Sequence, residues 1–218
     1  MSVLLEETIF HPNVTGKEID AAVSMAISEN RFGICVPPFW VKRAKREIGL
    51  RELQLITMVG YPLGFQMTET KCDELIRAID NGANEVDIAM NLSSFKSNMP
   101  WTKIEFAKCA LLAHERKIPV KFIFNQEFLS LDELITCSKM ASDAGIDYVC
   151  IDFTHDPNVQ NPDIINAVRK SLSPQCGLKI LISYYNPDDA DLFQDLGVER
   201  VGIRMNSNEF LASMTNTH

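Results

Sequence analysis

The 218-residue sequence has no excess of basic residues and no long apolar run. Lys and Arg number 21 against 29 Asp and Glu, which gives a formal net charge of -8, and this balance offers no attraction for nucleic acid or an anionic membrane. No segment approaches the ~20 consecutive apolar residues of a membrane span, and the opening M-S-V-L-L-E-E-T lacks the basic start of a signal peptide. We therefore expect a cytoplasmic protein whose partner is a small molecule rather than nucleic acid or a membrane.

The sequence also lacks paired cysteines and a glycine-rich phosphate turn. Its six cysteines are widely spaced, with no C-x-x-C motif that would bind zinc or cycle between redox states. They are expected to be reduced thiols, mostly small core residues. No glycine-rich turn follows an early strand, as it often does in open doubly wound sheets. We expect no cofactor.

Short apolar runs of strand type alternate with longer stretches of helical periodicity. Seven runs have the character of strands, at 33–36, 55–60, 85–91, 121–125, 148–153, 178–183 and 200–204, and a weaker one lies at 4–8. Gly82, Gly145 and Gly197 end helical stretches just before a strand, where a left-handed helix stop is favoured. Eight uninterrupted β-α units predict an α/β protein, with a single (β/α)8 TIM-barrel domain spanning residues 1–218.

Four charged side chains interrupt or adjoin the apolar runs, namely Glu6, Asp87, Lys121 and Lys179. An unpaired charge inside a barrel would cost several kcal/mol, so two acids and two bases are expected to neutralise one another. Lys179 should therefore point into the barrel, within ion-pair reach of Asp87 or Glu6. The same charges are also consistent with a purely structural network at the barrel top, or with side chains that simply face solvent.

Further polar residues follow the sixth and eighth strands, where barrel active sites lie. Asp152, His155 and Asp156 end the sixth strand, and Arg204 ends the eighth. Three candidate ligands on one loop, with no matching pattern elsewhere, do not make a convincing metal site, and we expect no metal. Cys150 lies inside the sixth strand and has two interpretations, a neutral core thiol or a nucleophile activated by His155.

Several segments together resemble the deoxyribose-phosphate aldolase family, a class I aldolase on a (β/α)8 barrel. The resemblance runs collinearly from about residue 4 to residue 205. It is carried by E-E-T-I-F-H-P-N-V-T, I-C-V-P-P, V-G-Y-P-L-G, N-G-A-N-E-V-D-I-A-M-N and V-K-F-I-F-N. It implies a Schiff base between a sixth-strand lysine and an aldehyde, a second lysine on the next strand, acids that relay protons, and a homodimer.

The resemblance assigns family positions to the charged residues. Asp87 matches the fourth-strand acid, and Lys179 matches the second lysine. Lys121 matches a fifth-strand lysine, Cys35 a second-strand cysteine, and Glu6 stands where the family usually has aspartate.

Two features of the family pattern are missing. Laying Y-V-C-I-D-F-T over the family's V-K-T-S-T-G places Cys150 at the Schiff-base lysine, and a thiol cannot form an iminium. The glycine turns that cradle phosphate are replaced by I-S-Y-Y, which contains Ser183, and by G-I-R-M, in which Gly202 remains. Arg204 could still pair with an anion.

Three functional hypotheses follow. The first is a barrel without Schiff-base activity that binds a small metabolite, such as an aldehyde or an anionic metabolite, in a retained acid/base pocket. The second is an active class I aldolase using Lys179 or Lys121. The acids expected beside Lys179 would hold it protonated, which disfavours this second hypothesis. The third is a changed enzyme that uses Cys150 with His155.

Overall fold

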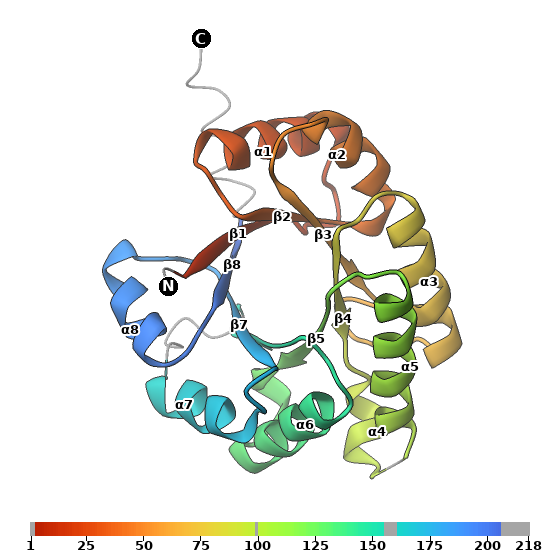
Figure 1. Cartoon of the computed structure of the whole chain (residues 1–218), viewed down its shortest axis with the longest axis vertical. Coiled ribbons are helices and arrows are strands. Elements are labelled where there is room, and N and C mark those ends of the chain that lie inside the picture. Colours follow the sequence, from red (N-terminus) through yellow and green to blue (C-terminus); the bar gives the residue numbers. More distant parts are fainter. Residues whose placement is uncertain (1–2, 99, 155–160, 206–218) are drawn as a thin grey trace.

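Eight parallel strands close into a barrel in chain order, and β8 pairs with β1 (Figure 1). The computed structural model describes residues 3–98, 100–154 and 161–205. The strands are β1 (Leu4–Thr8), β2 (Gly33–Val36), β3 (Gln54–Val59), β4 (Glu85–Ala89), β5 (Val120–Asn125), β6 (Tyr148–Asp152), β7 (Gly177–Ile182) and β8 (Arg200–Arg204). This confirms the predicted TIM barrel and all eight expected strands to within two residues at each end.

Helices surround the barrel on its outside (Figure 1). They are α1 (Gly16–Ser28), α2 (Val41–Ile48), α3 (Thr68–Asp80), α4 (Leu92–Lys96), α5 (Trp101–Glu115), α6 (Leu131–Asp143), α7 (Pro162–Ser171) and α8 (Ala190–Asp195). Thr15 and Ser130 begin α1 and α6 with capping boxes, which satisfy free backbone N–H groups of the first turn. Among the described residues, we find no helix that combines the length and the apolar composition of a membrane span.

Glycine ends the helices at the three positions that the sequence indicates. Gly82, Gly145 and Gly197 have φ values of 108°, 83° and 72°. This left-handed region is unfavourable for residues with a Cβ atom. Each glycine directs the chain from a helix into the next strand, and so sets where that strand enters the barrel.

The strands are buried on both faces, as expected for a parallel sheet covered by helices. On β6, Val149 and Ile151 belong to the large apolar layer between strands and helices, whereas Cys150 belongs to a small separate cluster inside the barrel. Alternation along the strand therefore directs Cys150 inward. The inner cluster consists of Cys35, Ile56, Met58, Ile123, Cys150 and Leu181, with Phe10 and Tyr61 packed against it.

Candidate functional site

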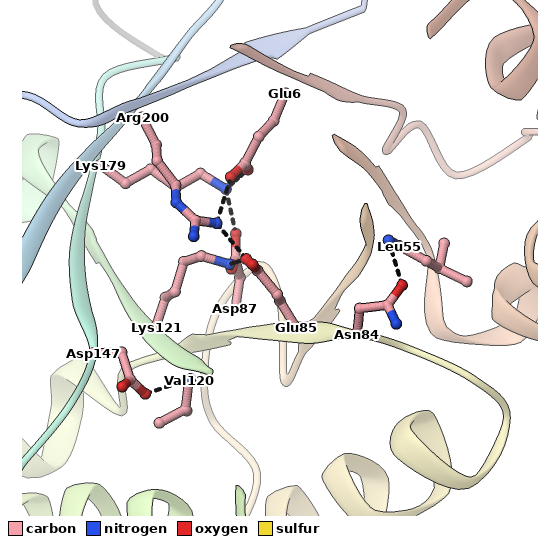
Figure 2. Close-up of polar contacts among 10 residues, drawn as sticks. All are labelled: Glu6, Leu55, Asn84, Glu85, Asp87, Val120, Lys121, Asp147, Lys179 and Arg200. Atoms are coloured by element: carbon pink, nitrogen blue, oxygen red, sulfur yellow. Dashed lines mark hydrogen bonds and ion pairs between the residues drawn. The ribbon is translucent and has the colours of Figure 1, made fainter. Parts of the chain in front are cut away.

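Six charged side chains fill the barrel interior near the N-terminal ends of the strands (Figure 2). Each occurs within the first three residues of its strand, and each residue is buried. They are Glu6, Glu85, Asp87, Lys121, Lys179 and Arg200. Three acids and three bases make the group electrically neutral. We call this group the ionic ring.

The two lysines connect the three acids. Lys179 contacts both Glu6 and Asp87, with its Nζ 2.6 Å from Asp87 Oδ2. The Nζ of Lys121 lies 2.9 Å from Asp87 Oδ1 and 2.5 Å from Glu85 Oε2. Asp87 therefore gives one carboxylate oxygen to each lysine. The predicted inward orientation of Lys179 and its pairing with Asp87 and Glu6 are confirmed.

Arg200 closes the ring. Its Nη1 contacts Glu85 and lies 3.3 Å from Glu6 Oε1. The guanidinium also lies over two aromatic rings, 4.5 Å from the centroid of Phe32 and 4.3 Å from that of Tyr148, which adds cation–π attraction in a desolvated site. Every base thus contacts two acids, and every acid contacts two bases.

This pairing keeps Asp87 and the two lysines of the ring ionised despite their burial. Burial disfavours the charge on Asp87, but the charges of Lys121 and Lys179 outweigh it and lower the Asp87 pKa to about 2. Burial likewise disfavours the charged form of Lys179, but Asp87 and Glu6 outweigh it and raise the Lys179 pKa well above its ordinary value. The Lys121 pKa is raised for the same reason, mainly by Asp87. Both amines are therefore protonated near neutral pH.

Two thiols lie beside the ring. Cys150 and Cys35 are fully buried. Burial raises the Cys150 pKa well above its ordinary value, although the charge of Lys179 opposes this. Burial and the charge of Asp87 raise the Cys35 pKa in the same direction. Both cysteines are neutral thiols near pH 7, the form that is a poor nucleophile.

A separate cavity of about 410 Å³ lies at the other end of the barrel, where the strands end. It is lined by Pro62, Leu63, Phe65, Ala89, Met90, Leu92, Ile123, Asn125, Glu127, Phe128 and Asp152. Among the expected site residues that the structure describes, Asp152 is the one in this lining. Six other expected residues have no exposed surface, namely Glu6, Asp87, Lys121, Lys179, Cys35 and Cys150. Apolar side chains of the inner cluster, among them Met58 and Leu181, occupy strand positions between the ring and the strand ends.

The remaining expected residues have different surroundings. Asp152 ends β6 and accepts hydrogen bonds from the backbone N–H and hydroxyl of Thr154. Ser183 follows β7 and donates its hydroxyl to the Thr154 carbonyl, at 2.9 Å. Arg204 ends β8 and is partly exposed. His155 and Asp156 lie outside the described residues.

Gly202 lies against the ionic ring. A Cβ atom at this position would be 2.8 Å from Leu181 Cδ1 and 3.2 Å from Lys179 Cε. The absence of a side chain therefore leaves room for the Lys179 stem as it extends to its two carboxylates. This packing is a structural reason for glycine here, independent of any phosphate contact.

Sequence reasoning missed two members of the ring, Glu85 and Arg200. Each begins its strand, where a charge looks like part of an exposed loop. The available signal is the period-two spacing, since Glu85 shares a strand face with Asp87, and Arg200 shares one with Gly202. Within the described part of the chain, no group of three or more His, Cys, Asp and Glu side chains has the arrangement to hold a metal ion.

The chain is similar in sequence to known proteins over most of its length. No model of a protein family matches the chain. It is 27% identical over 199 residues to deoxyribose-phosphate aldolase from Enterococcus faecalis, covering 91% of this chain and 90% of that protein. It is 28% identical over 203 residues to deoxyribose-phosphate aldolase from Brevibacillus brevis, covering 93% and 91%. The chain is a homologue of deoxyribose-phosphate aldolases.

Solved structures of aldolases have the same fold. A putative deoxyribose-phosphate aldolase from Coccidioides immitis gives a TM-score of 0.81 at 24% identity, covering 92% of this chain and 80% of that one. The deoxyribose-phosphate aldolase from Aeropyrum pernix, described as a unique tetramer, gives a TM-score of 0.80 at 20% identity, covering 98% and 90%. The aldolase-like barrel thus extends over nearly the whole chain.

Proposed function

We propose that this aldolase-like barrel lacks the Schiff-base activity of deoxyribose-phosphate aldolases and binds a small metabolite at its mouth. The observation that carries the proposal is the closed ionic ring. Both interior lysines of the ring contact two carboxylates each, so neither amine is available as a nucleophile.

Carbonyl attack needs a neutral amine, because a protonated amine has no free electron pair. Because its pKa is raised well above its ordinary value, Lys179 is almost entirely protonated at pH 7. Loss of its proton would also leave Glu6 and Asp87 with one cation fewer in a buried site. The same argument applies to Lys121, and both disfavour a relocated Schiff base.

Cys150 supports the same proposal. By its resemblance to the family's sixth strand, this residue stands at the Schiff-base position. A thiol adds to an aldehyde to give a thiohemiacetal, which does not withdraw electrons as an iminium does. Complete burial and a raised pKa reduce its reactivity further.

The cavity at the mouth is the best candidate for the metabolite. Its volume of about 410 Å³ falls in the range of small-molecule sites, which are largely apolar with a few convergent polar groups. Asp152, Asn125 and Glu127 supply those polar groups. Arg204 lies at the end of β8. Its guanidinium would be available to bind an aldehyde or an anionic metabolite at this end of the barrel.

The test is reductive trapping with acetaldehyde and borohydride, followed by intact mass measurement and peptide mapping. We expect no adduct on Lys179 or Lys121, while the Enterococcus faecalis relative serves as the positive control. An adduct on either lysine would support the active-aldolase hypothesis instead. Parallel alkylation with iodoacetamide tests the third hypothesis, because rapid labelling of Cys150 in the native protein would require an activated thiol.

A further inference from the structure

The polar side chains of the cavity at the barrel mouth come from one part of the barrel wall. They are Asn125, Glu127 and Asp152, and all three belong to β5, to β6 or to the short 3₁₀ helix Gln126–Phe128 that follows β5. Pairing of β5 with β6 sets Asn125 opposite Asp152. Asn125 Oδ1 also accepts a hydrogen bond from the Glu127 backbone N–H, at 3.0 Å. These neighbouring elements therefore bring two carboxylates to the same part of the cavity.

The two carboxylates leave the cavity with negative charge alone. Among the described residues, its lining includes no Lys, Arg or His. Asp152 is only 3% exposed, and no Lys or Arg in the described ranges forms an ion pair with Asp152 or Glu127. A buried carboxylate without a cation is unfavourable. A cationic group that entered the cavity would therefore be attracted to this part of its wall.

A base that contacts the lining from outside is already neutralised. Lys71 Nζ donates a hydrogen bond to the carbonyl of Ala89, a lining residue, at 2.7 Å, and lies 2.9 Å from Glu105 Oε2. Arg204 is not among the residues that line the cavity. An anion inside the cavity would therefore be repelled by two carboxylates, with no base in the described lining to offset the repulsion.

The remainder of the lining is apolar and suits the body of an organic molecule. Leu63, Phe65 and Phe128 are 54%, 66% and 49% exposed, so they offer apolar surface to a ligand. Aromatic rings also attract organic cations. A bare divalent cation would need about six oxygen ligands and would gain nothing from the apolar surface.

We propose that this cavity binds an organic amine in its protonated form, with the ammonium at Asp152 and Glu127 and an apolar body against Leu63, Phe65 and Phe128. This inference rests on the proposed binding of a small metabolite at the barrel mouth, and it specifies the charge of that metabolite. An ammonium is a donor without acceptor capacity, so it matches the two carboxylates. The binding is non-covalent.

The test compares three probes that share an apolar body and differ in the charge of the head group, namely phenethylamine, phenethyl alcohol and hydrocinnamate. Each is titrated at neutral pH into the full-length, isotope-labelled protein, and NMR shifts of the backbone amides locate the site. Phenethylamine should bind about tenfold more tightly than either other probe, since a hydrogen bond to a charged group is worth this much or more. Its shifts should centre on Asn125, Glu127 and Asp152.

Substitutions separate local charge from net charge. Asp152→Asn can still accept the hydrogen bonds of Thr154, but it should weaken phenethylamine binding about tenfold while hardly changing that of phenethyl alcohol. Glu127→Gln should weaken phenethylamine binding less, because Glu127 is exposed. The matched control is Glu52→Gln, an exposed acid just before β3 and so at the opposite end of the barrel, which should leave all three affinities unchanged. Circular dichroism checks that each variant is folded.

The possible outcomes distinguish this inference from the proposed function. Equal or tighter binding of the alcohol or of hydrocinnamate at the lining residues overturns the inference and leaves a metabolite site at the mouth. Equal weakening by Glu52→Gln and Asp152→Asn also overturns it, because the attraction would then come from the net charge. Binding of none of the probes removes the cavity as the metabolite site, and the inference with it. Borohydride trapping tests the loss of Schiff-base activity separately.

Discussion

Lys179 and Asp87 contact each other inside the barrel, with 2.6 Å between Nζ and Oδ2, although they are 92 residues apart in the sequence. Asp87 also binds Lys121, and Lys179 also binds Glu6. The pair therefore cannot be altered without disturbing its neighbours. This dependence leads to predictions on stability, on ionisation and on the consequence of adding another amine.

Removing one acid should destabilise the fold strongly. Asp87→Ala leaves Lys121 and Lys179 short of a carboxylate in a fully buried site, and breaking a buried ion pair in this way costs about 3–5 kcal/mol. Urea unfolding should show this loss as a lower midpoint. The control is Asp80→Ala, which removes the exposed partner of Arg116 and should change stability by less than about 1 kcal/mol. Equal effects of the two substitutions would contradict a stabilising ring.

The Asp87 carboxyl should titrate at unusually low pH. Its folded pKa of about 2 is below the unfolded value of about 3.9. Its ionisation therefore contributes stability that is present above about pH 4 and is lost as the pH falls through 2, amounting to about 2–3 kcal/mol. Carbon NMR of the side-chain carboxyl against pH measures this directly. A midpoint near pH 4 in the folded protein would refute the assignment.

The lysines of the ionic ring should determine how stability changes at high pH. Lys179 and Lys121 have raised pKa values, so their contribution to stability is present below the unfolded pKa of about 10.4 and declines as the pH rises through the folded values. Urea midpoints between pH 7 and pH 11 should stay level and fall only at the alkaline end. A loss of stability beginning near pH 8 would mean that one amine is not held by its acids.

Cys150→Lys should introduce a nucleophile. The new side chain would extend from β6 beside Lys179, where burial and a neighbouring ammonium both favour the neutral amine. The acids of the ring are already paired. Borohydride trapping with acetaldehyde should therefore give an adduct at position 150 in this variant and none in the unmodified protein.

The matched control for that variant is Cys150→Met, a similarly long side chain without an amine, which should give no adduct. Turnover of the lysine variant should remain low if, as the family resemblance implies, the glycine turns that bind phosphate are replaced in this chain. Cleavage of deoxyribose 5-phosphate by the unmodified protein at about 1 per second or more, a rate ordinary for enzymes, would show that the catalytic lysine lies elsewhere.

Deoxyribose 5-phosphate should bind weakly. Ile182, Ser183 and Tyr185 stand where the resemblance implies a glycine turn, and the Ser183 hydroxyl already donates to the Thr154 carbonyl. Backbone amides can bind phosphate only where the main chain can approach the phosphate closely. Calorimetry should give a dissociation constant of about 1 mM or weaker, with the Enterococcus faecalis relative as the positive control. Micromolar affinity would contradict the prediction.

The sequence alone predicted the eight strands and the closed barrel. Apolar runs of strand length, each followed by a helical stretch, repeat along the chain, and glycines at 82, 145 and 197 mark where helices end. It also predicted the pairing of Lys179, because a lone ammonium within an apolar strand would be too unfavourable. These features depend on local periodicity and on the free energy of burial, which a sequence carries directly.

The ring as a whole was decided by the tertiary structure. Strand closure brings Glu6 on β1 and Arg200 on β8 into contact, and Arg200 also meets Glu85 across the barrel. The sequence does not reveal that two charges at strand starts face inward and meet a third far along the chain. Such contacts are fixed by the three-dimensional arrangement of the elements, because pairing energies act through space and carry no local sequence signature.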